Sequence, residues 1–494
     1  MILIAFVLVS VVALAIIAAT HNHHRMNTVC IAQAVIFTAL ASYLVLFRQV
    51  PVVSFLVGGE YFFIDHFGIF EVLIATVIFT CAAVYSRGYV EGLLESGELE
   101  KSSLKLFYMA WVLLLLVIVL AFISDNLALF WIFAEMTTII SAMLIAILAA
   151  RDNIEAAIKY IFIASVSMLF AFVGFIFLFE ISRVSLGTGT LNWTVLMQHA
   201  ATFSPGMMIA SFVLVFIGFA AKSGIFPFHT WLPEAHAKAP SAVSAILSGI
   251  LLNVGIYGII RMYALVHQTT ALATIAPLLA VFGLLTIGIA AFSMLPQKNL
   301  KKMVAFSSIE NMGILLVGLA ISTPVALFWV LFHILAHSLT KASLFFSSGI
   351  LHRQYRSRFS SDAADEIKDV FRYQPLAAWG IILGGLAIIG MPPFPIFFTE
   401  FFIMLQLGTV SLWALCVMIV LLFIAAGGLG YFVITSFTHV SEPDTPPDLE
   451  PYRAPASMKV PIIFLLALLL IIGIFLPAQG MEFLNQIVTE LKFS

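Results

Sequence analysis

The sequence predicts an all-α, polytopic membrane protein, and three observations lead to that fold class. Hydrophobic residues make up 62% of the 494 residues, charged residues only 10%, and the mean hydropathy is +1.12. Soluble domains carry roughly 25% charged residues, so water is not the main solvent of this chain. The apolar runs are long and unbroken, which favours helices over barrel strands because a helix satisfies its backbone hydrogen bonds internally.

Polar breaks divide the chain into about fourteen predicted membrane spans of roughly 20 residues each. The spans are expected near residues 2–20, 28–47, 68–86, 106–123, 126–149, 154–180, 207–226, 240–265, 272–295, 303–321, 323–350, 376–401, 410–438 and 459–477. The first run lacks a basic segment and a convincing cleavage site, so we interpret it as a retained span. Little sequence remains between the spans, and we predict a single membrane domain over residues 1–494.

Lysine and arginine gather in alternate connections, and cytoplasmic loops of membrane proteins are the ones that retain such charge. Of the 23 basic residues, 17 lie in odd-numbered connections and 4 lie in even-numbered connections or the C-terminus, while Lys222 and Lys341 lie inside spans. We therefore predict a multi-pass protein of the cell inner (cytoplasmic) membrane with both termini extracytoplasmic. The connector at 352–374 is then cytoplasmic, and the proline-rich acidic segment 442–451 is expected to be an extended loop.

Composition also argues against several classes of function. The net charge of −2 is scattered rather than arranged in a basic stripe, so nucleic acid is not an expected partner. Cys30, Cys81 and Cys416 form no C-x-x-C pair, so we expect no redox centre, cofactor or metal in this chain. No nucleophile–base pair indicates an intramembrane enzyme, and whether the chain has any catalytic role of its own stays open.

Ionisable side chains inside the spans are the candidate functional residues, because a charge at mid-bilayer costs at least roughly 2.5–3.5 kcal/mol. Glu135 lies halfway along the span at 126–149, and Lys222 lies in the span at 207–226. Glu310 lies about two turns into the span at 303–321. For each of these residues the alternative is a charge that is paired to permit folding, or a side chain that reaches water at a span end. For Glu310, a position close enough to the interface to meet water is as good an interpretation as a functional role inside the membrane.

Three further ionisable residues share one helical face. His333, His337 and Lys341 are spaced at i, i+4 and i+8, so imidazoles or waters along this face could relay a proton. A buried histidine by itself is more often a satisfied core residue. His229, in the loop after the span at 207–226, is a weaker candidate for a direct role.

Helix breakers accompany the charge in two of the spans. Lys222 precedes Gly224 and Pro227, and Glu400 follows a group of three prolines, Pro392, Pro393 and Pro395. Broken helices at corresponding positions of two halves are typical of inverted-repeat transporters. We predict two inverted five-helix repeats, spans 4–8 at about 106–265 and spans 9–13 at about 272–438, with spans 7 and 12 broken. An ordinary proline kink is the alternative for either span alone.

At these residues the sequence resembles a known family, the antiporter-like subunits of respiratory complex I, Mrp cation/proton antiporters and group 4 membrane-bound hydrogenases. The resemblance is carried by residues 222–241, 131–135, 298–313, 333–341 and 390–401, and covers about residues 60–435. It implies an ion pair between Glu135 and Lys222, a central relay at Lys341 and a terminal relay at Glu400 toward the next subunit.

Two departures refine the resemblance. Complex I and Mrp members commonly carry a lysine where this chain has Asn253, which removes one ionisable relay but can still hydrogen-bond water. The motif from Ser307 to Asn311 also replaces a common Ser-His pair. Both features are more similar to the F component of hydrogenase-4 and formate hydrogenlyase complexes.

The function expected from the resemblance is proton conduction by a non-catalytic subunit of an energy-converting oxidoreductase complex. Its partners would be other antiporter-like and hydrogenase-type membrane subunits and the lipid bilayer, with sodium left open as the coupling ion. Two alternatives remain, an Mrp-type cation/proton antiporter subunit and a self-sufficient solute permease.

Overall fold

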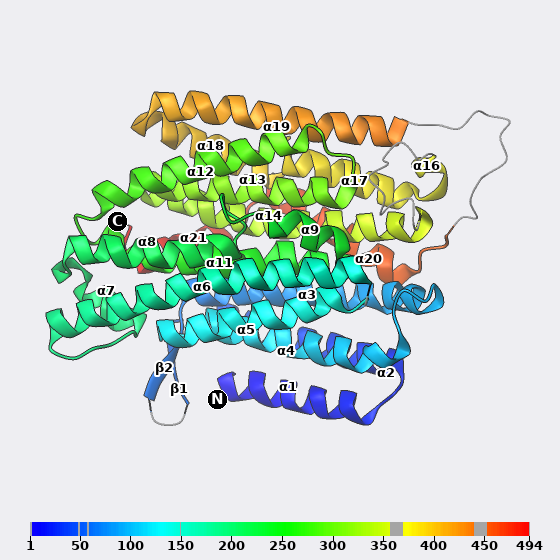
Figure 1. The fold of residues 1–494 in the computed structure, drawn as a ribbon, viewed down its shortest axis with the longest axis horizontal. Helices are drawn as coiled ribbons and strands as arrows, with labels where there is room; N and C mark the ends of the chain where they lie inside the picture. Colours follow the sequence, from blue (N-terminus) through cyan, green and yellow to red (C-terminus); the bar gives the residue numbers. More distant parts are fainter. Residues whose placement is uncertain are drawn as a thin grey trace.

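The computed structural model describes residues 2–47, 50–56, 59–148, 150–355, 369–438 and 452–493. Long helices lie side by side in one bundle, and the two termini lie at the same end of it (Figure 1). In the described ranges, thirteen helices are long and apolar enough to cross a membrane. The twelfth predicted span, at 376–401, is divided into two shorter apolar helices, and the predicted all-α polytopic class is confirmed.

The first part of the chain folds into six long helices and one hairpin. The helices are α1 Ile2–Ala19, α2 His23–Phe47, α3 His66–Glu95, α4 Leu104–Phe122, α5 Leu127–Ala146 and α6 Arg151–Leu186. Polar caps fix where two of them start: Asp65 accepts a hydrogen bond from the Gly68 amide, and Asn126 accepts one from the Ala128 amide. The antiparallel strands β1 Val52–Leu56 and β2 Gly59–Ile64 were not predicted from the sequence.

The middle of the chain contains the first broken span. Its elements are α7 Trp193–His199, α8 Pro205–Lys222, α9 Trp231–Lys238, α10 Ser241–Ile246, a π-helical turn at Leu247–Leu251, and α11 Leu252–His267. Helix α8 ends at Lys222, and Gly224 then adopts a left-handed conformation with φ of 67°. The Trp231 indole donates to the Ala221 carbonyl at 2.9 Å and so satisfies one acceptor at the broken end.

The last part of the chain contains the second broken span. Its elements are α12 Leu272–Met294, α13 Leu300–Ala320, α14 Pro324–Tyr355, α16 Val370–Tyr373, α17 Pro375–Ile388, α18 Pro395–Val410, α19 Leu412–Thr438, α20 Ala456–Ile474 and α21 Ala478–Glu490. The predicted continuous run at 376–401 is wrong in detail, because α17 ends at Ile388 and α18 continues to Val410. Gly390 between them is left-handed, with φ of 69°. Both predicted breaks are therefore present, in spans 7 and 12.

Two segments with predicted roles fall outside the description, wholly or in part. Residues 356–368 of the connector at 352–374, and the loop at 442–451, lie outside the described residues. Short helix α16, in the described part of the connector, lies at the end of the bundle opposite the two termini (Figure 1).

A buried ion pair joins the start of α3 to α11. Arg261 contacts Asp65 with nitrogen–oxygen distances of 2.6 and 2.7 Å, and it also donates to the Tyr257 hydroxyl at 2.6 Å. Its guanidinium lies 4.3 Å from the Trp193 ring centroid. Arg261 was one of the four basic residues counted in even-numbered connections or the C-terminus, and that placement is wrong because the folded chain buries it inside the bundle.

We expect Arg261→Met to destabilise the protein by about 3–5 kcal/mol, because it leaves the Asp65 carboxylate buried without a cation. The free energy of unfolding in detergent or bicelles measures this loss. Arg183→Met is the matched control, since Arg183 pairs with Glu180 on the surface and its loss should change little. Equal stability of the Arg261→Met protein and the wild type would contradict the expectation.

Candidate ion-translocation site

Lys222 lies at the broken end of α8 and reaches into α5. It is 2% exposed, and its ammonium donates to the Ala134 carbonyl at 2.7 Å and to the Thr138 hydroxyl at 2.8 Å. Two of the three ammonium donors are thereby satisfied by oxygens of one neighbouring helix. The break in α8 places this amine inside the bundle rather than along a continuous helix face.

Glu135 lies on the same stretch of α5 but does not touch Lys222. It accepts a hydrogen bond from the Ser165 hydroxyl of α6, while its second carboxylate oxygen is buried without a partner. Among the described residues, no carboxylate lies within 4.0 Å of the Lys222 amine. The ion pair that the resemblance implied is thus not closed in this structure, although Glu135 remains an electrostatic neighbour of Lys222.

Lys341 occupies the centre of α14 and has the same kind of environment. It is fully buried, and its amine donates to the Val304 carbonyl at 2.9 Å and to the Ser307 hydroxyl at 2.5 Å, both on α13. Lys222 and Lys341 are therefore each held by one carbonyl and one hydroxyl of an adjacent helix. Such contacts stabilise an ammonium without fixing it to a carboxylate.

Glu310 lies one turn beyond Ser307 on α13. It is 5% exposed, so its carboxylate is inside the bundle and the water-facing alternative is not supported. It is an electrostatic neighbour of both Lys341 and Glu400. Glu310 therefore lies between the central lysine and the second broken span.

His333 and His337 differ although they share one face of α14. The His333 ring bonds to Thr399 at 2.8 Å and to Asn311 at 2.9 Å, and these residues are the chain neighbours of Glu400 and Glu310. Neither ring nitrogen of His337 has a partner, although the residue is fully buried. His333 thus links α13 to α18 through residues next to Glu310 and Glu400, and His337 is available to water.

Glu400 lies in the first turns of α18, against the left-handed Gly390. A Cβ atom at Gly390 would lie 2.3 Å from the Glu400 carboxylate, so only glycine leaves room for it. Glu400 is 8% exposed and borders a groove of about 690 Å³ between α18 and α19 that is otherwise largely apolar. It is the last ionisable member of the series along the chain, and it lies beside a groove between two helices.

Asn253 links α11 to a buried carboxylate, Glu71, that was not predicted as a site residue. Its amide donates to Glu71 of α3 at 3.1 Å and to Ser338 of α14 at 3.0 Å. Glu71 is fully buried. It was overlooked because it lies near the predicted start of its span at residue 68, where a carboxylate is expected to reach water.

The histidines around the first break lie in different surroundings. His229 is partly exposed in the segment between α8 and α9. His236 on α9 is fully buried, stacks on Phe345 of α14 at 4.9 Å, and has no partner for either ring nitrogen. Of the two, His236 is the electrostatic neighbour of Lys341, and no local pattern in the sequence indicates that difference.

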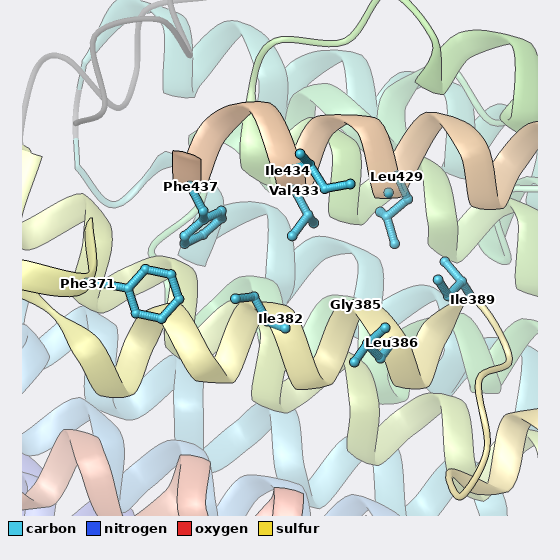
Figure 2. Close-up of a pocket in the computed structure, with 10 residues that line it drawn as sticks. Phe371, Ile382, Gly385, Leu386, Ile389, Leu429, Val433, Ile434 and Phe437 are labelled. Carbon is cyan, nitrogen blue, oxygen red and sulfur yellow. The ribbon is translucent and has the colours of Figure 1, made fainter. Parts of the chain in front are cut away.

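A polar cavity opens at the end of the bundle opposite the termini. It has a volume of about 600 Å³ and its polar lining comes from several segments of the chain: Tyr89, Glu98, Arg151, Asp152, Asn153, Lys238, Lys301 and His352. A second pocket, of about 320 Å³, lies between α17 and α19 (Figure 2). Only hydrocarbon side chains and glycines line that pocket, so it offers no ligand to an ion.

These features define a polytopic helical membrane protein with a buried series of eight ionisable side chains and one amide around two broken helices. We call this series the buried polar axis: Glu135, Lys222, Glu71, Asn253, His337, Lys341, Glu310, His333 and Glu400. In the part of the chain that the structure describes, no three His, Cys, Asp or Glu residues are arranged to hold a metal ion.

The chain belongs to the NADH:quinone oxidoreductase/Mrp antiporter transmembrane family, whose model matches residues 124–425. It is 32% identical over 457 residues to a hydrogenase-4 component F homolog of Methylacidiphilum infernorum, covering 92% of each chain. It is 29% identical to hydrogenase-4 component B of Escherichia coli over 70% of this chain, but spans only 51% of that longer protein. The predicted family and its hydrogenase-4 branch are confirmed.

Solved structures share the fold. The chain matches a chain of an archaeal membrane-bound sulfane sulfur reductase with a TM-score of 0.86 at 20% identity, covering 99% of this chain and 97% of that one. It matches a chain of respiratory complex I from Thermus thermophilus with a TM-score of 0.81 at 19% identity, covering 99% of both.

Proposed function

We propose that this chain is a proton-translocating membrane subunit of an energy-converting oxidoreductase complex of the hydrogenase-4 type. The observation that carries the proposal is the buried polar axis, which runs from α5 through α8, α14 and α13 to α18. Intramembrane ionisable residues are costly, so a connected series of them indicates an ion pathway. Two relatives, a hydrogenase-4 component F homolog and hydrogenase-4 component B, support the assignment to a complex of that type.

The contacts of the two lysines suggest how protons move. Each amine is held by a carbonyl and a hydroxyl, which leaves one donor position for water. The polar cavity of about 600 Å³ would admit protons, Lys222 and Lys341 would pass them along, and Glu310 and His333 would lead to Glu400. The groove beside Glu400 would let it deliver the proton to an adjacent subunit.

Purification of the native complex tests the proposed assembly. We expect hydrogenase-like peripheral and membrane subunits to co-migrate with this chain, whereas small antiporter subunits would favour the Mrp-type alternative. The chain reconstituted alone should transport little or nothing. Vigorous solute transport by the isolated chain would overturn the proposal in favour of a self-sufficient permease.

We also propose that the chain lies in the cell inner membrane with both termini extracytoplasmic. In a Cys416→Ser background, which removes the exposed native thiol, Thr202→Cys is expected to react with an impermeant maleimide from outside intact cells. Arg372→Cys should react only after the cells are opened. Both positions are exposed in the described structure, and the reverse labelling pattern would contradict the orientation.

A further inference from the structure

We propose that Glu71 of α3 is a proton-carrying group of the buried polar axis, acting where α11 carries Asn253 instead of an ionisable side chain. The inference rests on the proposed function and adds a residue from outside the two five-helix repeats. Asn253 then bridges two helices and is not a substitute proton carrier, because its amide does not titrate.

Geometry places Glu71 next to the central relay. One Asn253 amide group donates to both Glu71 and Ser338, at 3.1 and 3.0 Å. Ser338 lies between His337 and Lys341 on α14, so a single asparagine separates the Glu71 carboxyl from the central segment of that helix. Ser248 extends the contact toward α13, through a 2.8 Å hydrogen bond to Ser308.

The backbone around Asn253 is shaped for this close approach. The π-helical turn at Leu247–Leu251 directly precedes it, and such turns are frequent at functional sites. A Cβ atom at Gly249 would lie 3.1 Å from Ile78 of α3 and 3.2 Å from the Ser338 carbonyl. Glycine at this position therefore lets α3 and α14 meet on the two sides of the turn.

Unpartnered atoms mark the path between these groups. One oxygen of Glu71, the amide oxygen of Asn253 and both ring nitrogens of His337 are buried without a hydrogen-bond partner among the described residues. Buried polar atoms in proteins are almost always bonded, to protein or to internal water. Such atoms on α3, α11 and α14 therefore indicate water between Glu71 and His337, which is what proton transfer requires.

A structural role alone does not account for a carboxyl group at this position. Glutamine would make the same hydrogen bond to Asn253 without the cost of an ionisable group in hydrocarbon. In the described chain, no lysine, arginine or histidine nitrogen lies within 4.0 Å of Glu71 to pair with it. The distinguishing property of Glu71 is that it can take up and release a proton.

The test measures ions moved per electron in liposomes that contain the intact complex. Glu71→Gln preserves the shape and the Asn253 contact, so the complex should assemble, but ion movement should fall at least about tenfold. Adding Asn253→Lys to that variant should restore much of it by supplying a proton carrier on α11. Glu180→Gln, which alters an exposed carboxylate, is the control and should behave as the wild type.

A spectroscopic readout covers variants that assemble poorly. Glu71→Asp keeps a carboxyl group, and it should shift a carboxyl stretching band in infrared spectra recorded during turnover. Full ion movement in Glu71→Gln, or an unshifted band in Glu71→Asp, would overturn the assignment. If the wild-type complex moves no ions, the proposed function itself fails. If Lys341→Met stops ion movement but Glu71→Gln does not, only the Glu71 assignment fails.

Discussion

Replacing Lys341 with methionine is expected to abolish coupled ion movement while the complex still assembles and transfers electrons. The amine lies at the centre of the axis, bonded to the Val304 carbonyl and the Ser307 hydroxyl. Methionine fills a similar volume but offers no proton, so the path between α8 and Glu310 is interrupted. Ion movement and electron transfer are measured separately in the same liposomes.

Lys159→Met is the matched control for that replacement. Lys159 is an exposed lysine that pairs with Glu155 and Glu234 at the surface, so its loss should leave ion movement near the wild-type level. Wild-type ion movement in a correctly assembled Lys341→Met complex would refute the relay role of Lys341.

The second large effect is expected at Glu135 and Lys222. In the structure the two charges are separated, with Lys222 bonded to Ala134 and Thr138 and Glu135 bonded to Ser165. Closing the pair would bring the unpartnered second oxygen of Glu135 to the remaining donor of Lys222. Opposite charges within about 4–6 Å favour each other's ionised form, so opening and closing would change the proton affinity of Lys222. We therefore expect the two arrangements to act as a gate.

Three variants separate a gate from a structural pair. Glu135→Ala and Lys222→Ala should each reduce ion movement strongly. Glu135→Leu/Lys222→Met removes both charges, and a merely structural pair should tolerate it because packed hydrophobes often replace buried ion pairs. A gate should not tolerate it: the double variant should assemble but move no ions. Full coupled activity in the double variant would leave the pair with a packing role only.

Much of the architecture could be predicted because hydrocarbon imposes local rules on the chain. Apolar runs set the spans, and the glycines and prolines near Lys222 and Glu400 indicated the two breaks that the structure contains at Gly224 and Gly390. The candidate residues were found by the same reasoning, since an ionisable side chain in a span needs an explanation.

The remaining features depend on contacts between distant segments. Glu71 meets Asn253 only because α3 packs against the π-helical turn, and no local pattern in α3 indicates that neighbour. The partners of Lys222 and Glu135 are likewise set by how α5, α6 and α8 pack. The β1–β2 hairpin was missed because its strands are short and lie beside apolar spans.

The most direct test of the central claim uses the unmodified native complex in sealed liposomes containing a pH-sensitive dye. When an electron donor is supplied, we predict a pH change across the membrane that a protonophore collapses and that persists in sodium-free buffer. Electron transfer at full rate with no ion movement would contradict the account. Ion movement that requires sodium would contradict the assignment of the proton as the coupling ion.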